Sequence, residues 1–190
     1  MEINKIAVLM VMAMATPIAH LSAAELDSEV AQAKKAIKSF VVDLKGELKS
    51  NLKAKGPVAT IEICNKAAPE ITKKKSARYA GTIGRTSLRL RNPKNAPDAW
   101  ELATLKEFEV RKSNGESIKK IDKAEVVAQD GKRFFRYMKA IPTGEACVKC
   151  HGADIKSAVA KKLDALYPED KARGFSKGDI RGAFTVMRPL

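Results

Sequence analysis

Apolar residues recur every three or four positions between residues 25 and 55, which is the spacing of an amphipathic helix. The residues on this face are Leu26, Val30, Ala33, Ile37, Val41, Leu44, Leu48 and Leu52. Gly56 and Pro57 follow directly, and this pair favours the end of a helix. The pattern therefore predicts one long N-terminal helix whose apolar face packs on the rest of the chain.

Residues 58–68 predict a second, shorter helix, because Pro57 suits a first helical turn and apolar side chains share one face. Cys64 lies on that apolar face. We expect Pro69 to end or kink the helix, since proline lacks the backbone N–H that continues one. The run Lys73-Lys74-Lys75-Ser76 is then expected to be a polar connector.

Downstream, the apolar pattern changes to the alternation that is typical of strands. Residues 82–91 alternate between charged and apolar side chains and predict a half-exposed strand. Residues 124–128 and 132–141 predict a hairpin, because Asp130-Gly131 between them favours a tight turn. A last strand is predicted over residues 180–187.

Helical patterns over residues 97–112 and 155–166 interrupt these strands. No internal repeat and no linker divides the chain, and its 190 residues suit one domain with a substantial core. Mixed helices and a small antiparallel sheet place the fold in the α+β class.

The N-terminus has the features of a secretory signal. An apolar run over residues 6–19 follows Lys5, and small residues follow the run up to Ala24. The run is short for a membrane span, although an uncleaved membrane anchor is the alternative. We interpret residues 1–24 as a signal peptide, with a mature domain over residues 25–190 that is periplasmic and has no membrane span.

The chain is strongly basic, with a formal net charge of +14. A basic protein can bind nucleic acid, acidic lipid or an acidic protein. Export argues against nucleic acid, and the lysines are scattered as on solvated helix faces. An acidic redox or signalling protein is the partner that this charge favours.

The chemistry of the chain is concentrated in Cys147-Val148-Lys149-Cys150-His151. This pattern is typical of covalent haem attachment, in which both thiols bond to the porphyrin and the histidine is the proximal iron ligand. A redox disulfide between Cys147 and Cys150 is one alternative, although the chain lacks the βαβ setting of such motifs. Zinc bound by these three residues and Cys64 is another. We favour one covalent haem c.

The ligand on the other side of the iron is open. His151 is the single histidine after the predicted signal, which contains His20, so ligation by two histidines is excluded. Methionine is the usual partner in electron transfer, and Met138 and Met187 are candidates together with a lysine or water. Cys64 has the stronger case, because it is the one remaining thiol and lies on an apolar helix face. A small buried hydrophobic residue is the alternative role for Cys64.

Two further sets of residues are candidates for the haem pocket. Phe135, Tyr137 and Met138 lie on the strand that leads into the pentapeptide and could form a wall, although a core role is equally compatible with the pattern. Arg85, Arg89 and Arg91 could bind the haem propionates as bidentate partners. A solvated strand face is the alternative for these arginines.

Several runs resemble a family of exported single-haem c-type domains. They are Glu62-Ile63-Cys64-Asn65, Ile83-Gly84-Arg85-Thr86-Ser87-Leu88, Asn92-Pro93-Lys94-Asn95-Ala96-Pro97-Asp98-Ala99-Trp100, Phe135-Arg136-Tyr137-Met138 and Gly178-Asp179-Ile180-Arg181-Gly182. The resemblance covers essentially the whole mature chain. It implies a PAS-like fold, an antiparallel sheet flanked by helices with a long N-terminal helix, and an axial pair of His151 and Cys64.

An iron with a thiolate and a histidine ligand favours the ferric state, so its reduction potential should be low. Loss of the Cys64 ligand on reduction would open a position for CO or NO. We therefore expect a redox or gas sensor, with a low-potential periplasmic electron-transfer cytochrome as the alternative. We expect no enzymatic activity, because no second histidine is present to act as an acid–base group.

Overall fold

The computed structural model describes residues 21–190. Most of the predicted signal peptide, including His20, therefore lies outside the described residues, and its cleavage stays a prediction. Within the described range, no helix combines the length and the apolar character needed to cross a membrane.

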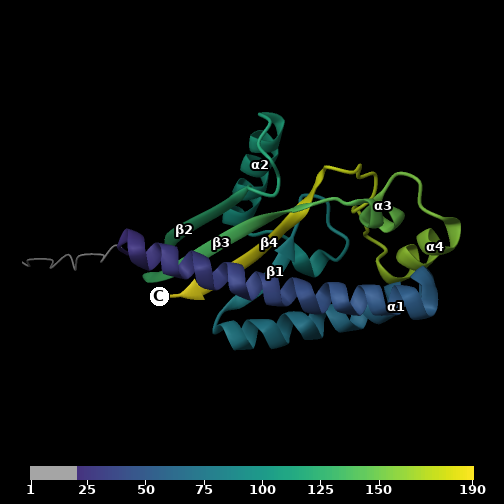
Figure 1. The fold of residues 1–190 in the computed structure, drawn as a ribbon, viewed down its shortest axis with the longest axis horizontal. Coiled ribbons are helices and arrows are strands. Elements are labelled where there is room, and N and C mark those ends of the chain that lie inside the picture. Colours follow the sequence, from purple (N-terminus) through teal and green to yellow (C-terminus); the bar gives the residue numbers. More distant parts are fainter. Residues whose placement is uncertain (1–20) are drawn as a thin grey trace, which may run out of the picture.

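The centre of the fold is a four-stranded antiparallel sheet with the strand order β1-β4-β3-β2 (Figure 1). Its strands are β1 Thr82–Thr86, β2 Asp122–Gln129, β3 Lys132–Pro142 and β4 Ile180–Pro189. The inner strands β3 and β4 pair along most of their length, with an irregular register between Ile141 and Pro142. The chain leaves β3 at this irregular end and enters the pentapeptide.

Helices cover both faces of the sheet and one of its ends. They are α1 Ala23–Tyr79, the 3₁₀ helix η1 Pro93–Asn95, α2 Ala99–Ser113, α3 Glu145–His151 and α4 Ser157–Leu166. Figure 1 shows α1 turning back on itself, so that its two arms lie side by side along the sheet. Helices α3 and α4 lie at the end of the molecule where α1 turns.

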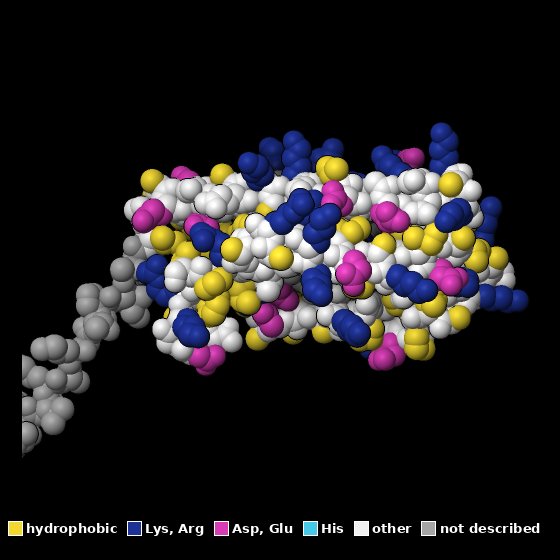
Figure 2. Space-filling model, turned by 90° about the horizontal axis from the view of Figure 1, so that it is seen from below, with side chains coloured by type: hydrophobic (Ala, Val, Ile, Leu, Met, Phe, Trp, Pro, Cys, Tyr) yellow, Lys and Arg dark blue, Asp and Glu magenta, His cyan; other side chains and the backbone are white. Residues whose placement is uncertain are grey.

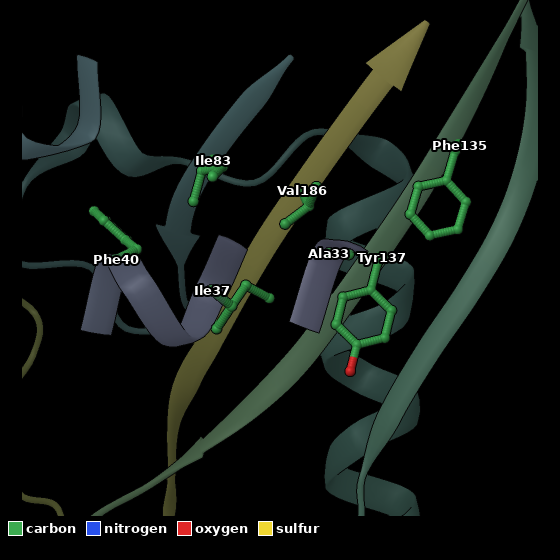
Figure 3. Close-up of a cluster of buried hydrophobic side chains, with 7 residues drawn as sticks. All are labelled: Ala33, Ile37, Phe40, Ile83, Phe135, Tyr137 and Val186. Atoms are coloured by element: carbon green, nitrogen blue, oxygen red, sulfur yellow. The ribbon is translucent and has the colours of Figure 1, made fainter. Parts of the chain in front are cut away.

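Apolar side chains point alternately to the two faces of the sheet and so form two apolar cores. On one face, the sheet residues Ile83, Phe135, Tyr137 and Val186 pack against Ala33, Ile37 and Phe40 of α1 (Figure 3). On the other face, Met138, Ala140, Ile180 and Ala183 pack against Leu105 and Phe108 of α2, together with Ile121. Because successive side chains of a strand point to opposite faces, β3 contributes to both cores.

The first arm of α1 matches the predicted helix. It begins at Ala23, two residues before the predicted start, because Ser22 and Glu25 form a reciprocal capping box. It ends at Gly56, whose φ of 72° and ψ of 176° are not helical. Glycine tolerates this positive φ without strain.

The second arm of α1 is longer than predicted, and of the two effects expected of Pro69, an end or a kink, the end does not occur. The helix continues through Pro69 and through the lysines that were expected to form a connector. Lys75 is buried, and its ammonium donates to Ser39 Oγ at 2.6 Å and pairs with Asp43 at 2.8 Å. These contacts with the first arm form only when the two arms pack together. The free energy gained from the contacts and the packing outweighs the backbone hydrogen bond lost at Pro69.

The predicted strand over residues 82–91 ends at Thr86. The Ser87 hydroxyl accepts from the Arg89 N–H and donates to the Arg181 carbonyl, which turns the chain out of the sheet. The predicted hairpin, the two later helices and the last strand are confirmed as β2 and β3, α2 and α4, and β4. The α+β class, with an antiparallel sheet flanked by helices and a long N-terminal helix, is likewise confirmed.

Replacing Phe40 with alanine should lower the free energy of unfolding by about 3–5 kcal/mol, because it leaves a cavity in the core between α1 and the sheet. Phe40 is fully buried and packs edge-on against Phe184. Val42, two positions away and 62% exposed, gives the control, and Val42→Ala should change stability by less than about 0.5 kcal/mol. Urea denaturation measures both values, and equal losses would contradict the docking of this arm.

Candidate functional site

Helix α3 carries the complete pentapeptide in two turns. Cys147, Cys150 and His151 are each partly buried, and none of the cysteines is in a disulfide. The helix ends directly at His151. A Cβ atom on the next residue, Gly152, would lie 2.6 Å from the carbonyl oxygen of Val148, so only glycine allows the chain to leave the helix here.

His151 is held in a defined orientation. Its Nδ1 lies 2.8 Å from the Ala172 carbonyl oxygen, which accepts a hydrogen bond from the Nδ1–H. Arg181 Nε lies 3.2 Å from the same nitrogen, but a protonated Nδ1 cannot also accept from it. Burial, together with the charges of Arg181 and Arg91, lowers the pKa of His151 to about 3. The ring is therefore neutral with a free Nε2, which is the form that binds a metal.

A chain segment over residues 170–175 lies against the end of α3. The Phe175 N–H donates to the His151 carbonyl, and the Gly174 N–H donates to the Gly152 carbonyl, both at 2.9 Å. The Phe175 ring also packs edge-on against the His151 ring, with 6.2 Å between centroids. Because the Ala172 carbonyl belongs to the same segment, these bonds fix the acceptor of the imidazole proton.

Asp170 anchors this segment from inside. Its side chain is 2% exposed and forms ion pairs with Arg91 at 3.2 Å and with Arg173 at 3.1 Å. It also accepts from the Ala172 N–H at 2.9 Å. Burial by itself would raise the pKa of Asp170, but the Ala172 N–H and the Arg91 guanidinium outweigh it and hold the pKa below its usual value. Arg91 also donates to the carbonyl of Cys150 at 2.5 Å and so joins Asp170 to α3.

Other guanidinium groups near His151 have no carboxylate in an ion pair within residues 21–190. Arg181 donates to Ser87 Oγ and to the Arg89 carbonyl. Burial and the charges of Arg91 and Arg85 lower the pKa of Arg181 to about 10. Burial also lowers the pKa of Arg85. The site is therefore strongly positive around the imidazole.

Cys64 lies on the second arm of α1, near the turn. Burial raises the pKa of its thiol and the Glu47 carboxylate raises it further, whereas the positive charge of Arg85 opposes both. An ion pair of 3.1 Å between Glu62 of α1 and Lys162 joins this arm to α4. Cys64 and α3 are thus at the same end of the sheet, with Arg85 electrostatically coupled to both Cys64 and Arg181.

The structure does not bring the predicted aromatic wall to this end of the sheet. Phe135 and Tyr137 are buried in the core against α1, and Met138 is buried in the core against α2. The Tyr137 hydroxyl donates to Asp122 at 2.8 Å. Their place along the middle of β3 makes them packing residues, so the core role left open by the sequence is the one observed. The same placement removes Met138 as a neighbour of His151.

Arg85 and Arg91 differ in their contacts, and Arg85 lies 6.0 Å from the centroid of the Phe40 ring. Arg91 is engaged with Asp170 and backbone carbonyls, whereas Arg85 forms no hydrogen bond or ion pair within the described residues. Arg89 donates to the carbonyls of Arg173 and Gly174 and stacks on Phe175, with its guanidinium 3.6 Å from the ring centroid. None of the three forms the predicted row along a strand, because only Arg85 is in β1.

The alternative of zinc finds no support in the geometry. Among residues 21–190, no group of three or more histidine, cysteine and acidic side chains is arranged to hold a metal ion. Cys64 therefore does not complete a tetrahedral set with the pentapeptide, as a structural zinc site would require.

Sequence reasoning missed Asp170, the Ala172 carbonyl and Arg181. Arg181 lies in one of the runs that carry the family resemblance, and this was its only signal. The other two act through contacts with α3 that no spacing along the chain reveals. Asp170 and the Ala172 carbonyl orient the imidazole, and Arg181 adds positive charge beside it.

The residues present fit a haem c. Two thiols and a neutral histidine with a free Nε2 lie on one short helix, and cationic side chains without carboxylate partners lie beside them. Cys147 and Cys150 would hold the porphyrin, His151 would bind the iron, and the guanidinium groups match the charge of two propionates.

Comparison with known proteins first confirms the fold. A crystal structure titled "Crystal structure of the cyanobacterial heme-protein Tll0287" superposes with a TM-score of 0.65. The match covers 86% of this chain and 96% of that one, with 21% sequence identity. It shows the same α+β architecture.

The family follows from the sequence match. The model of the Tll0287-like family matches residues 19–189, so the chain belongs to this family. A search of curated proteins finds no match. Membership agrees with the resemblance to a single-haem domain family that the sequence motifs indicate.

Replacing Asp170 with asparagine should lower the free energy of unfolding by about 3 kcal/mol, because it leaves Arg91 buried without its counter-charge. The carboxylate contributes fully above its unfolded pKa of about 4, and its contribution is lost as the pH falls through the lower folded value. The difference between Asp170→Asn and the unmodified chain should therefore be constant near neutral pH and shrink in acid. Denaturant titrations from pH 3 to pH 8 measure it.

Asp164→Asn is the matched control for this variant. Asp164 also pairs with Arg173, but its side chain is 63% exposed, so its loss should cost less than about 1 kcal/mol. A difference between the two variants that does not shrink in acid would show that Asp170 does not act through its charge.

Proposed function

We propose that this chain is an exported haem protein with one haem c bonded to Cys147 and Cys150. His151 is the proximal iron ligand and Cys64 the distal one. The observation that carries the proposal is the neutral His151, held through Nδ1 with Nε2 free, directly after two unpaired cysteines on the same helix. Membership of the Tll0287-like family and the structural match to a cyanobacterial haem protein support it.

The orientation of His151 supports strong binding to iron. A hydrogen bond from Nδ1–H to a carbonyl fixes the tautomer and makes Nε2 a stronger electron-pair donor to a metal. Asp170 and Arg91 hold the Ala172 carbonyl in place and are themselves shielded from water. The protein therefore contributes a rigid ligand on the proximal side.

Cys64 is the proposed variable ligand. As a thiolate it favours ferric iron and a low reduction potential. Burial raises the pKa of the free thiol, so a sulfur released from iron takes up a proton and does not return as readily. Cys64 then has a bound and a free state, on a helix that spans much of the molecule.

Two such states of Cys64 would suit a redox or gas sensor. A bound haem would supply an iron able to take CO or NO, and movement of Cys64 would be transmitted along α1. If Cys64 stays bound in both oxidation states, the same site is a low-potential electron carrier of the periplasm. An acidic redox or signalling protein is the proposed partner in either case.

The face seen in Figure 2 is compatible with such a partner and shows no single basic patch. Figure 2 shows lysine and arginine side chains spread over one face, with acidic side chains between them. This spread supports general electrostatic attraction to an acidic protein. We propose no enzymatic activity, because within residues 21–190 no second histidine is available as a distal acid–base group.

Expression with the haem-attachment machinery should yield a chain whose mass includes one haem, and Cys147→Ala combined with Cys150→Ala should abolish the attachment. In the haem-loaded protein, Cys64→Ala should remove the low-spin ferric spectrum with thiolate character. Met138→Ala is the control and should leave that spectrum unchanged, because Met138 is buried against α2. A spectrum that changes in Met138→Ala and not in Cys64→Ala would show that the assignment of Cys64 as the distal ligand is wrong.

The sensing role predicts that the ferrous protein binds CO, with a change in its absorption spectrum, while the ferric protein does not. Reduction should release Cys64 and open the position that CO takes. Cys64→Ala should bind CO at least as readily, since the position is then free from the start. A ferrous protein that is inert to CO and NO would favour electron transfer.

A further inference from the structure

Two guanidinium groups, those of Arg181 on β4 and Arg85 on β1, have no anionic partner within residues 21–190. Arg181 approaches the His151 imidazole to 3.2 Å, donates to the neutral oxygens of Ser87 and Arg89, and lies 5.0 Å from the centroid of the Phe175 ring. Arg85, on the neighbouring strand, forms no ion pair and no hydrogen bond through its side chain within residues 21–190. Both guanidinium groups are shielded from water, and burial is the main cause that lowers the pKa of each.

The lack of an anionic partner for Arg181 and Arg85 is unusual, because charges inside proteins are normally paired. Asp170, the carboxylate whose charge acts on Arg181, is already bound to Arg91 and Arg173. Arg85, Arg91 and Arg89 each add to the repulsion felt by Arg181. Arg91 Nε is in addition a buried donor without an acceptor. The cluster is thus short of negative charge and of acceptors.

We propose that Arg181 and Arg85 form a binding site for the two carboxylates of the haem propionates. This inference rests on the proposed haem function and adds how the group is oriented and its charge balanced. Carboxylates match the class of ligand, because a guanidinium donates two parallel hydrogen bonds to a carboxylate.

The geometry favours these two arginines over their neighbours. Arg91 is committed to Asp170 and the Cys150 carbonyl. Arg89 is held by two backbone carbonyls and by stacking on Phe175. Arg181 touches the imidazole itself, and when Nδ1 donates to Ala172 the Arg181 Nε–H is left without an acceptor.

Arg85 joins the carboxylate site to the distal ligand. Its charge acts on Cys64 as well as on Arg181. A propionate bound to Arg85 would neutralise that charge and weaken its stabilising effect on the nearby thiolate. The arginine pair would thereby influence the ligand that we propose as a switch.

The test compares the haem-loaded full chain with Arg181→Gln and Arg85→Gln, and uses Arg111→Gln as the control. Arg111 is a guanidinium of α2 that is already paired with Glu116 at 2.7 Å and has no contact with the Asp170 arrangement. Covalent haem content by mass spectrometry should be the same in all four proteins, because Cys147 and Cys150 are intact. Resonance Raman bands of the propionates should shift in the two test variants and not in the control.

A second readout is the reduction potential as a function of pH. Proton uptake by a Cys64 thiol released on reduction gives all the proteins the same pH slope, so each potential is taken relative to that of Arg111→Gln. With both arginines present the propionates stay ionised, and this relative potential should be flat from pH 5 to pH 8. Without one arginine, proton binding to a propionate should become about ten-fold tighter, equivalent to one pKa unit. The potential should then fall as the pH rises through this window, because an ionised propionate stabilises ferric iron.

The conservative variants Arg181→Lys and Arg85→Lys guard against loss of folding. Each keeps the charge and should largely restore the flat profile. Propionate bands and profiles that match those of Arg111→Gln in every variant would overturn the carboxylate site and leave the haem function standing. An unmodified chain that attaches no haem would overturn both.

Discussion

The buried carboxylate of Asp170 is the interaction on which the site depends. It is shielded from water, and it joins Arg91, Arg173 and the Ala172 N–H in one arrangement. Through Arg91 it reaches α3, and through Ala172 it reaches the imidazole of His151. A charge in this position is costly unless every partner is present, so the arrangement forms as a whole or is lost.

Packing and chemistry occupy different parts of the molecule. The large apolar side chains of β3 are buried in the two cores on either side of the sheet. The end of the sheet, where the register of β3 and β4 becomes irregular, instead carries α3 and a cluster of polar and charged groups. This separation lets the core hold the fold while the site holds a neutral histidine among cations.

The electrostatics of that end are asymmetric. Several guanidinium groups surround the imidazole, and Asp170 is the one carboxylate paired among them within the described residues. A site with this balance favours anionic ligands, and a thiolate and carboxylates are both anions. Burial is the main cause of the low pKa of His151, and the same positive field adds to it, since protonation would add a further charge to an already repulsive cluster.

The sequence by itself determined the pentapeptide, the long helix ending at Gly56, the β2–β3 hairpin and the α+β class, because these depend on local periodicity, turn chemistry and spacing. It could not determine that the helix continues through Pro69, since Lys75 finds Ser39 and Asp43 only after the arms pack. It also could not separate Phe135, Tyr137 and Met138 as core from a haem wall. The contacts of Asp170, Ala172 and Arg181 with α3 were decided by tertiary structure alone, because they join segments far apart in the chain.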